Sequence, residues 1–420
     1  MMKRILFINT LPIVNFSDGK GGSAGNQTLY NTLKGYSEAG YIVKVITFRD
    51  IQKKDNPFKN VEICRSKYYW IFKLILKFKK IFRGKKRSVT TSLSPIKLYY
   101  DKHLFKVWSI FGYFECKRVI KKFKPDILYG YEVYSTRLAK KLATKFDLPL
   151  VTRFQGTELG FFLNENNFFD YYDYIESTKV DSNLAIMAND GTDGDKVLEK
   201  IGFDMKKSVF WVNGLHDKDA YLRFQKDKNF WRRNFNLPQN SIVICTANRF
   251  VPWKRIDRII SLFDKCSKTN ENLHLFIIGD GQEKDALIKF AKKLKNDHIH
   301  FVGKMDHDKT IEYIGNSDIY ITLNHSGNLG NSILEALCLG TMVITYDSAS
   351  VYQVLSNGQN SFLINENENI AVDELNSLFK NNKQISSIGK NGRDYAKREL
   401  LSWGDRMTME TNLVDKLIKK

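Results

Sequence analysis

A glycine-bearing turn followed by a helical pattern carries residue types that could bind an anion. Gly327 and Gly330 let the backbone turn tightly and admit a ligand close to it. Asn331 and Ser332 are expected to cap the helix, and Gly340 is expected to end it. The start of a helix offers unpaired N–H groups and a partial positive charge, so this turn favours a phosphate.

Glu335 lies about one turn inside the same helix, where its carboxylate could accept hydrogen bonds from hydroxyl groups. A ligand that places a phosphate at the helix start and hydroxyl groups beside it would be a nucleotide sugar. The alternative is an ordinary turn between a strand and a helix, with Glu335 as a solvated helix residue. A glycine-rich turn alone does not separate the two interpretations.

Two cations follow a strand pattern that begins at Ile242. Arg249 comes at the end of this strand, and Lys254 follows five residues later, beyond Pro252. Two fixed cations at a strand end could neutralise a diphosphate as it leaves, so we expect neither a metal nor a cofactor. The alternative is that both are surface cations of a basic protein.

Length and composition bound the class of protein. With 420 residues, 43% of them hydrophobic, the chain can form two folded domains. Its five cysteines are scattered and odd in number, which predicts buried thiols in a reducing compartment. No apolar run reaches the roughly 18 residues of a membrane span, and the short apolar run at the N-terminus is typical of a buried strand. We therefore expect a cytoplasmic protein.

Strand and helix patterns alternate along the chain, which predicts an α/β fold with parallel sheets. We expect two Rossmann-like domains facing a cleft, with a ligand at the carboxyl ends of their strands. The predicted boundaries are 1–216 for the first domain, 217–239 for a polar linker, 240–393 for the second domain, and 394–420 for C-terminal helices that pack back on the first domain.

The formal net charge of +20 is concentrated in residues 67–87, which contain nine basic residues and no acidic one. On a helical wheel, one side carries Ile71, Leu74, Ile75, Phe78, Ile81 and Phe82, and the other carries Lys73, Lys77 and Lys80. Such a basic amphipathic helix suits an anionic membrane surface, which would make the protein peripheral on the inner membrane face. A core-packed helix with a solvated lysine face remains an equal alternative. Nucleic acid is not expected, because no recognition motif is present.

Several short motifs stand in the order and spacing of glycosyltransferase family 4, which this sequence resembles along essentially its whole length. They are Arg249–Lys254, Ile277–Gly281, Phe301–Gly303, Ser317-Asp318 and Leu334–Gly340, preceded by Gly21-Gly22, Gly156-Thr157-Glu158 and Asn213-Gly214. The resemblance implies a retaining enzyme of the GT-B fold, with an acceptor-binding first domain and a nucleotide-sugar-binding second domain.

The resemblance also implies roles for individual residues. Arg249 and Lys254 would hold the donor diphosphate and act as the catalytic cations, and Glu335 would bind the ribose hydroxyls. The other donor-binding positions would be Gly21, Gly22, Gly281, Lys304, Met305, Asn328, Leu329, Gly330, Asn331 and Ser332. The acceptor-binding positions would be Gln155, Thr157 and Glu158.

Two positions depart from the family pattern. Gly327 stands where the family has the first Glu of a Glu-x7-Glu motif, so the usual carboxylate near the donor sugar is missing. Gln155 replaces the frequent His before Gly-Thr, and an amide cannot act as an acid or base. Asn328 or Asn331 is expected to supply the hydrogen bonds of the missing carboxylate.

We therefore expect a metal-independent glycosyltransferase that moves a sugar from a nucleoside diphosphate sugar, with UDP as the expected nucleotide, to a hydroxyl of a lipid-linked or surface glycan. A sugar-nucleotide epimerase would bind the same donor but need no acceptor. A non-catalytic nucleotide-sugar-binding subunit would bind donor without transfer. Product analysis separates these three hypotheses.

Overall fold

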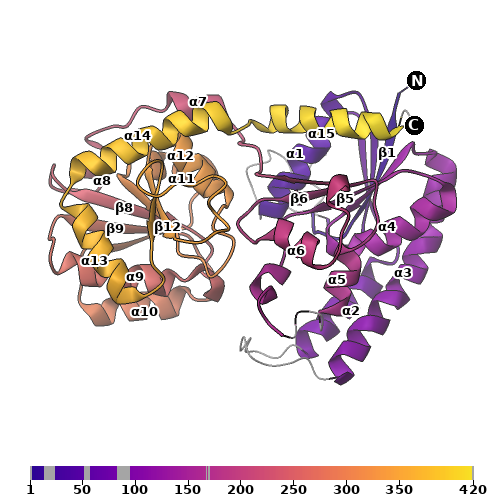
Figure 1. The fold of residues 1–420 in the computed structure, drawn as a ribbon, viewed down its shortest axis with the longest axis horizontal. Helices are drawn as coiled ribbons and strands as arrows, with labels where there is room; N and C mark the ends of the chain where they lie inside the picture. Colours follow the sequence, from indigo (N-terminus) through magenta and orange to yellow (C-terminus); the bar gives the residue numbers. More distant parts are fainter. Residues whose placement is uncertain are drawn as a thin grey trace. The chain divides into compact units, whose positions relative to one another are not determined.

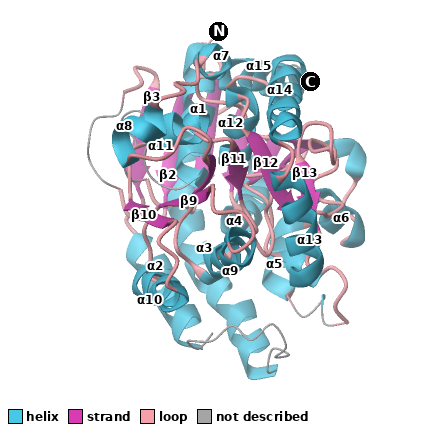
Figure 2. Ribbon diagram, turned by 90° about the vertical axis from the view of Figure 1, so that its left-hand side faces the viewer, coloured by secondary structure: helices cyan, strands magenta, loops and turns pink. Residues whose placement is uncertain are grey.

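The structure is a computed structural model, and it describes residues 2–13, 24–51, 57–82, 95–166, 168 and 171–418. The chain divides into two compact units (Figure 1). The first comprises Met1–Asn213 and Trp403–Lys420, and the second comprises Gly214–Ser402. In each unit, helices flank the strands of a parallel sheet (Figure 2).

The first unit contains a seven-stranded parallel sheet in the order β3-β2-β1-β4-β5-β6-β7. This order runs outward in both directions from β1 and β4, and ligands of such sheets bind beyond the carboxyl ends of the strands at that switch point. The edge strand β3 was not predicted, because it is only five residues long and most of its residues are not buried. The strands are β1 (Arg4–Asn9), β2 (Ile42–Thr47), β3 (Val61–Arg65), β4 (Ile127–Tyr131), β5 (Leu150–Phe154), β6 (Leu184–Ala188) and β7 (Ser208–Trp211).

Helices cover both faces of this sheet. Helices α1 and α15 bury one face and α2, α3 and α4 bury the other. The helices are α1 (Ala24–Glu38), α2 (Tyr69–Phe82), α3 (Pro95–Phe123), α4 (Val133–Phe146), α5 (Tyr172–Thr178), α6 (Gly194–Lys200) and α15 (Trp403–Ile418), with 3₁₀ turns at Leu159–Phe162 and Met205–Lys207.

The C-terminal helix α15 returns to the first unit, as the predicted fold requires, and lies beside α1 (Figure 1). Its Glu410 is fully buried and accepts hydrogen bonds from Arg153 of β5 at 2.7 Å and Tyr129 of β4 at 2.8 Å. Tyr36 of α1 donates a third bond at 3.1 Å. A buried charge is tolerated only when it is paired and hydrogen-bonded, so this cluster fixes α15 to the sheet.

The second unit contains a six-stranded parallel sheet in the order β10-β9-β8-β11-β12-β13, with its switch point between β8 and β11. Helices α9, α10 and α13 bury one face. The strands are β8 (Ile242–Ala247), β9 (Leu273–Ile278), β10 (Ile299–Gly303), β11 (Ile319–Ile321), β12 (Met342–Tyr346) and β13 (Phe362–Ile364). The helices are α7 (Lys218–Arg223), α8 (Phe230–Phe235), α9 (Ile256–Ser267), α10 (Lys284–Leu294), α11 (His307–Asn316), α12 (Asn331–Leu339), α13 (Glu368–Phe379) and α14 (Asn382–Glu399), with a 3₁₀ turn at Pro252–Lys254.

The stretch 217–239, expected as a linker, forms α7 and α8 and belongs to the second unit. Trp231 is buried against Phe276 of β9, with ring centroids 4.2 Å apart, and its indole N–H donates to the carbonyl of Asn316 at 2.8 Å. Although the stretch is mostly polar, its buried Trp231 packs it against the second sheet.

The basic helix α2 packs against the first sheet, as the core-packed interpretation predicts for its described residues. Ile71, Phe72 and Ile75 are buried, whereas Trp70 and Leu74 are 52% and 45% exposed. The predicted apolar positions Phe78, Ile81 and Phe82, and the predicted polar position Lys80, have side chains outside the described residues. Among the described helices, none has the length and hydrophobicity that crossing a membrane requires.

All five cysteines are unpaired thiols, and four of them are buried as expected. The exception is Cys64 on the edge strand β3, which is partly exposed and lies 3.1 Å from a carboxylate oxygen of Glu62.

Candidate functional site: the carboxyl edge of the second sheet

The switch point of the second sheet brings together the two stretches in which we predicted donor-binding residues. Arg249 and Lys254 lie in the loop after β8, and residues 324–330 lie in the loop after β11. The backbone N–H of His325 donates to the carbonyl of Trp253 at 2.9 Å, so the two loops are joined directly.

The loop after β8 carries both predicted cations. Arg249 is exposed, and it has no ion pair among the described residues. Lys254 is partly buried, and its ammonium lies 4.3 Å from the ring centroid of Trp253. A cation held over an aromatic face loses part of its freedom while it keeps its charge, so Lys254 is positioned at this edge.

Gly281 belongs to the loop after β9, which runs against the loop after β8. Phe250 N–H donates to the carbonyl of Asp280 at 2.9 Å, and Glu283 N–H donates to the carbonyl of Phe250 at 3.1 Å. A Cβ atom on Gly281 would lie only 2.4 Å from that carbonyl oxygen. Glycine is therefore required here by the close approach of two backbones.

The turn after β11 is held together by two asparagines. Asn328 is buried, and its side-chain amide accepts from Asn324 N–H at 3.1 Å and donates to the Asn324 carbonyl at 3.0 Å. Leu329 is also buried. Gly327 has φ 74°, a left-handed conformation that a glutamate would adopt only with strain. The conformation of this turn therefore favours glycine at position 327.

Helix α12 begins differently from the prediction. Gly330 is the N-cap residue and has no side chain with which to cap the helix, so the expectation that Asn331 or Ser332 stands at the cap position is wrong. Asn331 is already inside the helix, and the Ser332 hydroxyl oxygen lies 2.8 Å from the Tyr320 hydroxyl. A Cβ atom on Gly330 would meet nothing within 4 Å, so open space lies over the helix start. Gly340 ends the helix in a left-handed conformation, as predicted.

Glu335 is not a solvated helix residue. It is 8% exposed, and its Oε1 lies 2.9 Å from the Nε2 of His307, the first residue of α11. Sequence analysis did not select His307, although its place just after the β10 loop is a position from which side chains reach the carboxyl edge. The predicted Lys304 and Met305 lie in that loop, with Lys304 exposed and Met305 partly exposed.

At the carboxyl edge of the first sheet, the predicted Gln155 belongs to a hydrogen-bonded network. Its side-chain nitrogen donates to the Tyr131 hydroxyl at 2.8 Å, and its backbone N–H donates to Glu132 Oε1 at 3.0 Å. Glu132 follows β4 and has φ 72° and ψ 155°, a strained conformation for a residue with a side chain. Burial raises the pKa of the Glu132 carboxyl to about 7. Sequence analysis also missed Glu132, although it directly follows a buried strand.

The other predicted acceptor residues follow β5. Thr157 N–H donates to the Thr192 hydroxyl at 3.0 Å, and the Thr157 hydroxyl accepts from Leu159 N–H at 3.0 Å. Glu158 is partly exposed at the start of the 3₁₀ turn. The predicted Gly21 and Gly22 lie outside the described residues.

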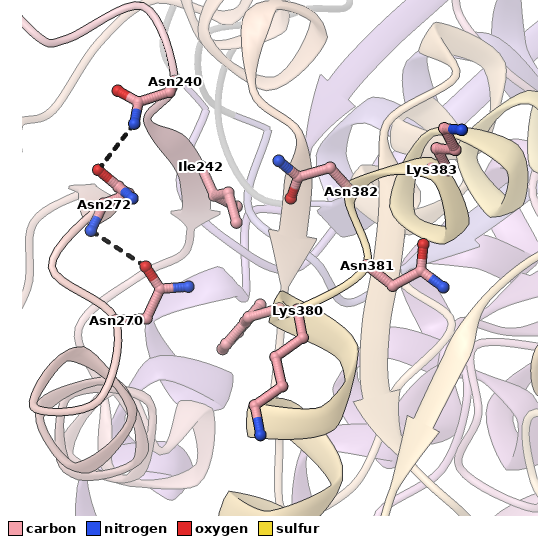
Figure 3. Close-up of a pocket in the computed structure, with 9 residues that line it drawn as sticks. Asn240, Ile242, Asn270, Asn272, Lys380, Asn381, Asn382 and Lys383 are labelled. Atoms are coloured by element: carbon pink, nitrogen blue, oxygen red, sulfur yellow. Dashed lines mark hydrogen bonds between the residues drawn. The ribbon is translucent and has the colours of Figure 1, made fainter.

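A polar hollow of about 380 Å³ lies at the opposite, amino edge of the second sheet (Figure 3). Its lining residues are Asn240, Ile242, Asn270, Asn272, Phe379, Lys380, Asn381, Asn382 and Lys383. The hollow contains none of the residues that we predicted for the donor. Because parallel sheets bind ligands at their carboxyl ends, we do not assign the donor to it.

No group of three or more His, Cys, Asp or Glu residues within the described ranges is arranged to hold a metal ion. Asp193 and Asp195 stand in an Asp-x-Asp spacing at the start of α6, but Asp193 is paired with Lys196 at 2.6 Å.

Residues 227–395 match the family model described as "Glycosyl transferases group 1". This segment contains all six strands of the second sheet and the loops at their carboxyl edge.

Relatives of this chain carry the names of glycosyltransferases. An uncharacterized glycosyltransferase of Methanocaldococcus jannaschii is 27% identical over 183 residues, which are 43% of this chain and 46% of that protein. The O-antigen biosynthesis glycosyltransferase WclY of Escherichia coli is 26% identical over 43% of this chain and 48% of its own length. The matched segment thus spans about half the length of these curated relatives.

Solved structures match along nearly the whole chain and define the fold as GT-B. Sucrose-phosphate synthase from Thermosynechococcus elongatus superposes with a TM-score of 0.71 at 14% identity, covering 99% of both chains. HepE of Anabaena in complex with UDP and glucose superposes with a TM-score of 0.65 at 16% identity, covering 98% of this chain and 99% of HepE.

Proposed function

We propose that this chain is a retaining glycosyltransferase that moves a sugar from a nucleoside diphosphate sugar to an acceptor hydroxyl. The observation that carries the proposal is the direct bond between the loops after β8 and β11. This bond joins Arg249 and Lys254 to the loop that leads to the open start of α12. Such an edge favours a diphosphate, because fixed cations and a helix start both stabilise negative charge.

Within this proposal, Arg249 and Lys254 stabilise the charge that develops on the departing diphosphate, as a preorganised electrostatic site does. The backbone at Gly330 and Ser332 contacts the phosphates or the sugar, and Glu335 accepts the ribose hydroxyls. The leaving phosphate itself takes the proton of the acceptor hydroxyl, so no protein nucleophile is needed. The two cations make the reaction metal-independent, and a chelator should leave turnover unchanged.

UDP is the proposed nucleotide and a glycan the proposed acceptor. The support for UDP is the fold shared with HepE, whose structures contain UDP and glucose. The support for a glycan is that relatives carry the names of O-antigen, lipopolysaccharide core and capsular polysaccharide glycosyltransferases. Gln155, Thr157 and Glu158 are the proposed acceptor-binding residues.

The test is incubation of the full chain with a panel of labelled nucleotide sugars, with and without glycan acceptors. Transfer of label to an acceptor with retained anomeric configuration supports the proposal. Release of an altered free nucleotide sugar without an acceptor would indicate an epimerase. Donor binding without hydrolysis or transfer would indicate a non-catalytic subunit, and either result would contradict the proposal.

We also propose that the enzyme meets a lipid-linked acceptor at the inner membrane face through α2 and α3. Five large apolar side chains on these helices are exposed, namely Trp70, Leu74, Ile110, Phe111 and Phe114. Lys73 and Lys77 of α2 are exposed with them. Exposed aromatic rings beside lysines suit the boundary between lipid headgroups and acyl chains.

Flotation with anionic liposomes tests this part of the proposal. Binding should fall at high salt and on replacing Lys73 and Lys77 by Ala, since each lysine near such a surface contributes about 1 kcal/mol. The matched control replaces Lys289 and Lys292 of α10, which removes the same charge elsewhere. Absent flotation, or flotation insensitive to salt and to both replacements, would contradict a charged docking surface.

A further inference from the structure

The contact between His307 and Glu335 joins two helices that follow different strands. His307 opens α11, which follows β10, and Glu335 lies in α12, which follows β11. The atoms Nε2 and Oε1 are 2.9 Å apart, and the two side chains are only 15% and 10% exposed. A hydrogen bond to a carboxylate with so little solvent access is strong enough to fix the orientation of both groups.

The imidazole of His307 is itself held in place by its surroundings. Asp306 caps α11 by accepting a hydrogen bond from Lys309 N–H at 2.8 Å, which fixes the start of the helix. The rings of His216 and Tyr221 both lie close to this histidine, each with its centroid 6.5 Å from that of His307. His307 is therefore a packed residue of the second unit and its orientation is determined.

Glu335 has one carboxylate oxygen engaged and one available. His307 occupies Oε1, whereas Oε2 has no hydrogen-bond partner among the described residues and is not fully enclosed. A carboxylate that must receive two neighbouring hydroxyl groups needs a fixed plane, and one engaged oxygen supplies it. The contact between His307 and Glu335 thus fixes the carboxylate in an orientation that leaves Oε2 able to accept hydrogen bonds from a ligand.

We propose that His307 is a positioning residue that orients Glu335 toward the ribose hydroxyls of the donor and thereby makes the site select ribonucleotides. This inference rests on the proposed function, because it takes the ligand at this edge to be a nucleoside diphosphate. The competing explanation is that the pair only ties α11 to α12. In that case its loss would lower stability without changing ribose selection.

The experiment compares the affinities of UDP and 2′,3′-dideoxy-UDP for the full chain by calorimetry. In the wild-type protein UDP should bind about 10- to 150-fold more tightly, the range for hydrogen bonds to a charged group. Glu335→Gln should remove most of this ratio. His307→Leu should reduce the ratio about tenfold, and His307→Gln, which keeps an N–H donor, should retain most of it. Dideoxy-UDP should bind all variants equally, since the diphosphate contacts are unchanged.

Each other outcome overturns a defined part of the inference. If wild-type protein binds UDP without preferring it over the dideoxy compound, the ribose assignment fails. If the preference exists and His307→Leu keeps it, the role of His307 fails and the structural explanation holds. If the wild-type protein binds none of UDP, ADP and GDP, the proposed function itself fails. Should His307→Leu not fold, His307→Asn, whose amide is too short to reach Glu335, gives the same comparison.

Discussion

The carboxyl edges of the two sheets satisfy their polar groups in different ways. At the first edge, hydrogen bonds within the protein link Gln155 to both Tyr131 and Glu132. At the second edge, Arg249 is exposed and the N-cap residue of α12 is a glycine, Gly330.

This difference indicates which edge suits a neutral hydroxyl and which suits a diphosphate. A neutral hydroxyl can exchange into an existing hydrogen-bond network at little cost, whereas a diphosphate needs an excess of positive charge and unpaired donors. This difference supports the proposal that the acceptor binds at the first edge and the donor at the second. The predictions below test this division, beginning with the largest expected effect.

The first edge depends on the C-terminal helix through Glu410. Glu410→Ala leaves Arg153 without its buried partner, and we expect the free energy of unfolding of the first unit to fall by about 3–5 kcal/mol. Denaturant unfolding measures this. The control is Glu62→Ala, which breaks the more exposed pair with Lys44 and should cost less than about 1 kcal/mol. Equal losses in the two variants would contradict the anchoring role of Glu410.

The second edge depends on its cations. Arg249→Ala or Lys254→Ala should each lower kcat with saturating donor by about 10²–10³-fold, the typical cost of removing one group that stabilises the charge of a transition state. Steady-state transfer assays measure the effect. Arg233→Ala is the control, because Arg233 is an exposed arginine of α8 paired with Asp227. Unchanged turnover would remove the cations from the mechanism.

Two glycines of the second edge should respond in opposite ways to an added methyl group. Gly281→Ala forces a Cβ atom against the Phe250 carbonyl and should cost about 1–3 kcal/mol of stability. Gly330→Ala has open space and should leave Tm nearly unchanged, yet weaken UDP binding about tenfold because the methyl group occupies the phosphate position. Thermal unfolding and calorimetry measure both. UDP affinity unaffected by Gly330→Ala would place the diphosphate elsewhere.

The stability of the first edge should decrease as pH rises. Burial raises the pKa of Glu132 from 4.5 to about 7, so the folded protein binds a proton that the unfolded chain has released. The stability that this proton supplies is complete below about pH 4.5 and lost as pH rises through about 7, by on the order of 3 kcal/mol. Glu132→Gln should abolish this slope. A slope that persists in Glu132→Gln would assign the titration to another group.

The second unit should respond to pH in the opposite direction. It contains six of the seven histidines, and burial lowers the pKa of His274, whose ring stacks with those of His298 and His300, to about 4. The unfolded chain therefore gains a proton first, and stability falls by about 1 kcal/mol as pH drops from about 6.5 to 4. Thermal unfolding of wild type and His274→Phe across this range measures it. A variant that keeps the full acid sensitivity would contradict the assignment.

The sequence predicts the fold well because each buried strand is a short apolar run that can be recognised from its own residues. The alternation of apolar strands and helices predicts both parallel sheets, and Gly340 predicts the end of α12. The prediction of the helix start fails because Asn331 and Ser332 have capping side chains, whereas the tight turn after Gly327 places Gly330 at the cap position.

Within the candidate site, sequence patterns select residues that lie near strand ends and miss those whose placement depends on tertiary contacts. Arg249 and Lys254 can be selected because both lie in the loop that follows a strand, β8. The bond from His307 to Glu335 depends on how α11 packs on α12, and no local pattern encodes that packing. Similarly, the raised pKa of Glu132 depends on burial by neighbouring strands.

A crystal structure of this chain with a bound nucleoside diphosphate sugar is the most direct test of the division between the two edges. We predict that the diphosphate lies at the start of α12, in contact with the backbone near Gly330 and with Arg249 and Lys254. A diphosphate bound at the first edge or in the polar hollow at the amino edge, with both cations turned away from it, would contradict the account.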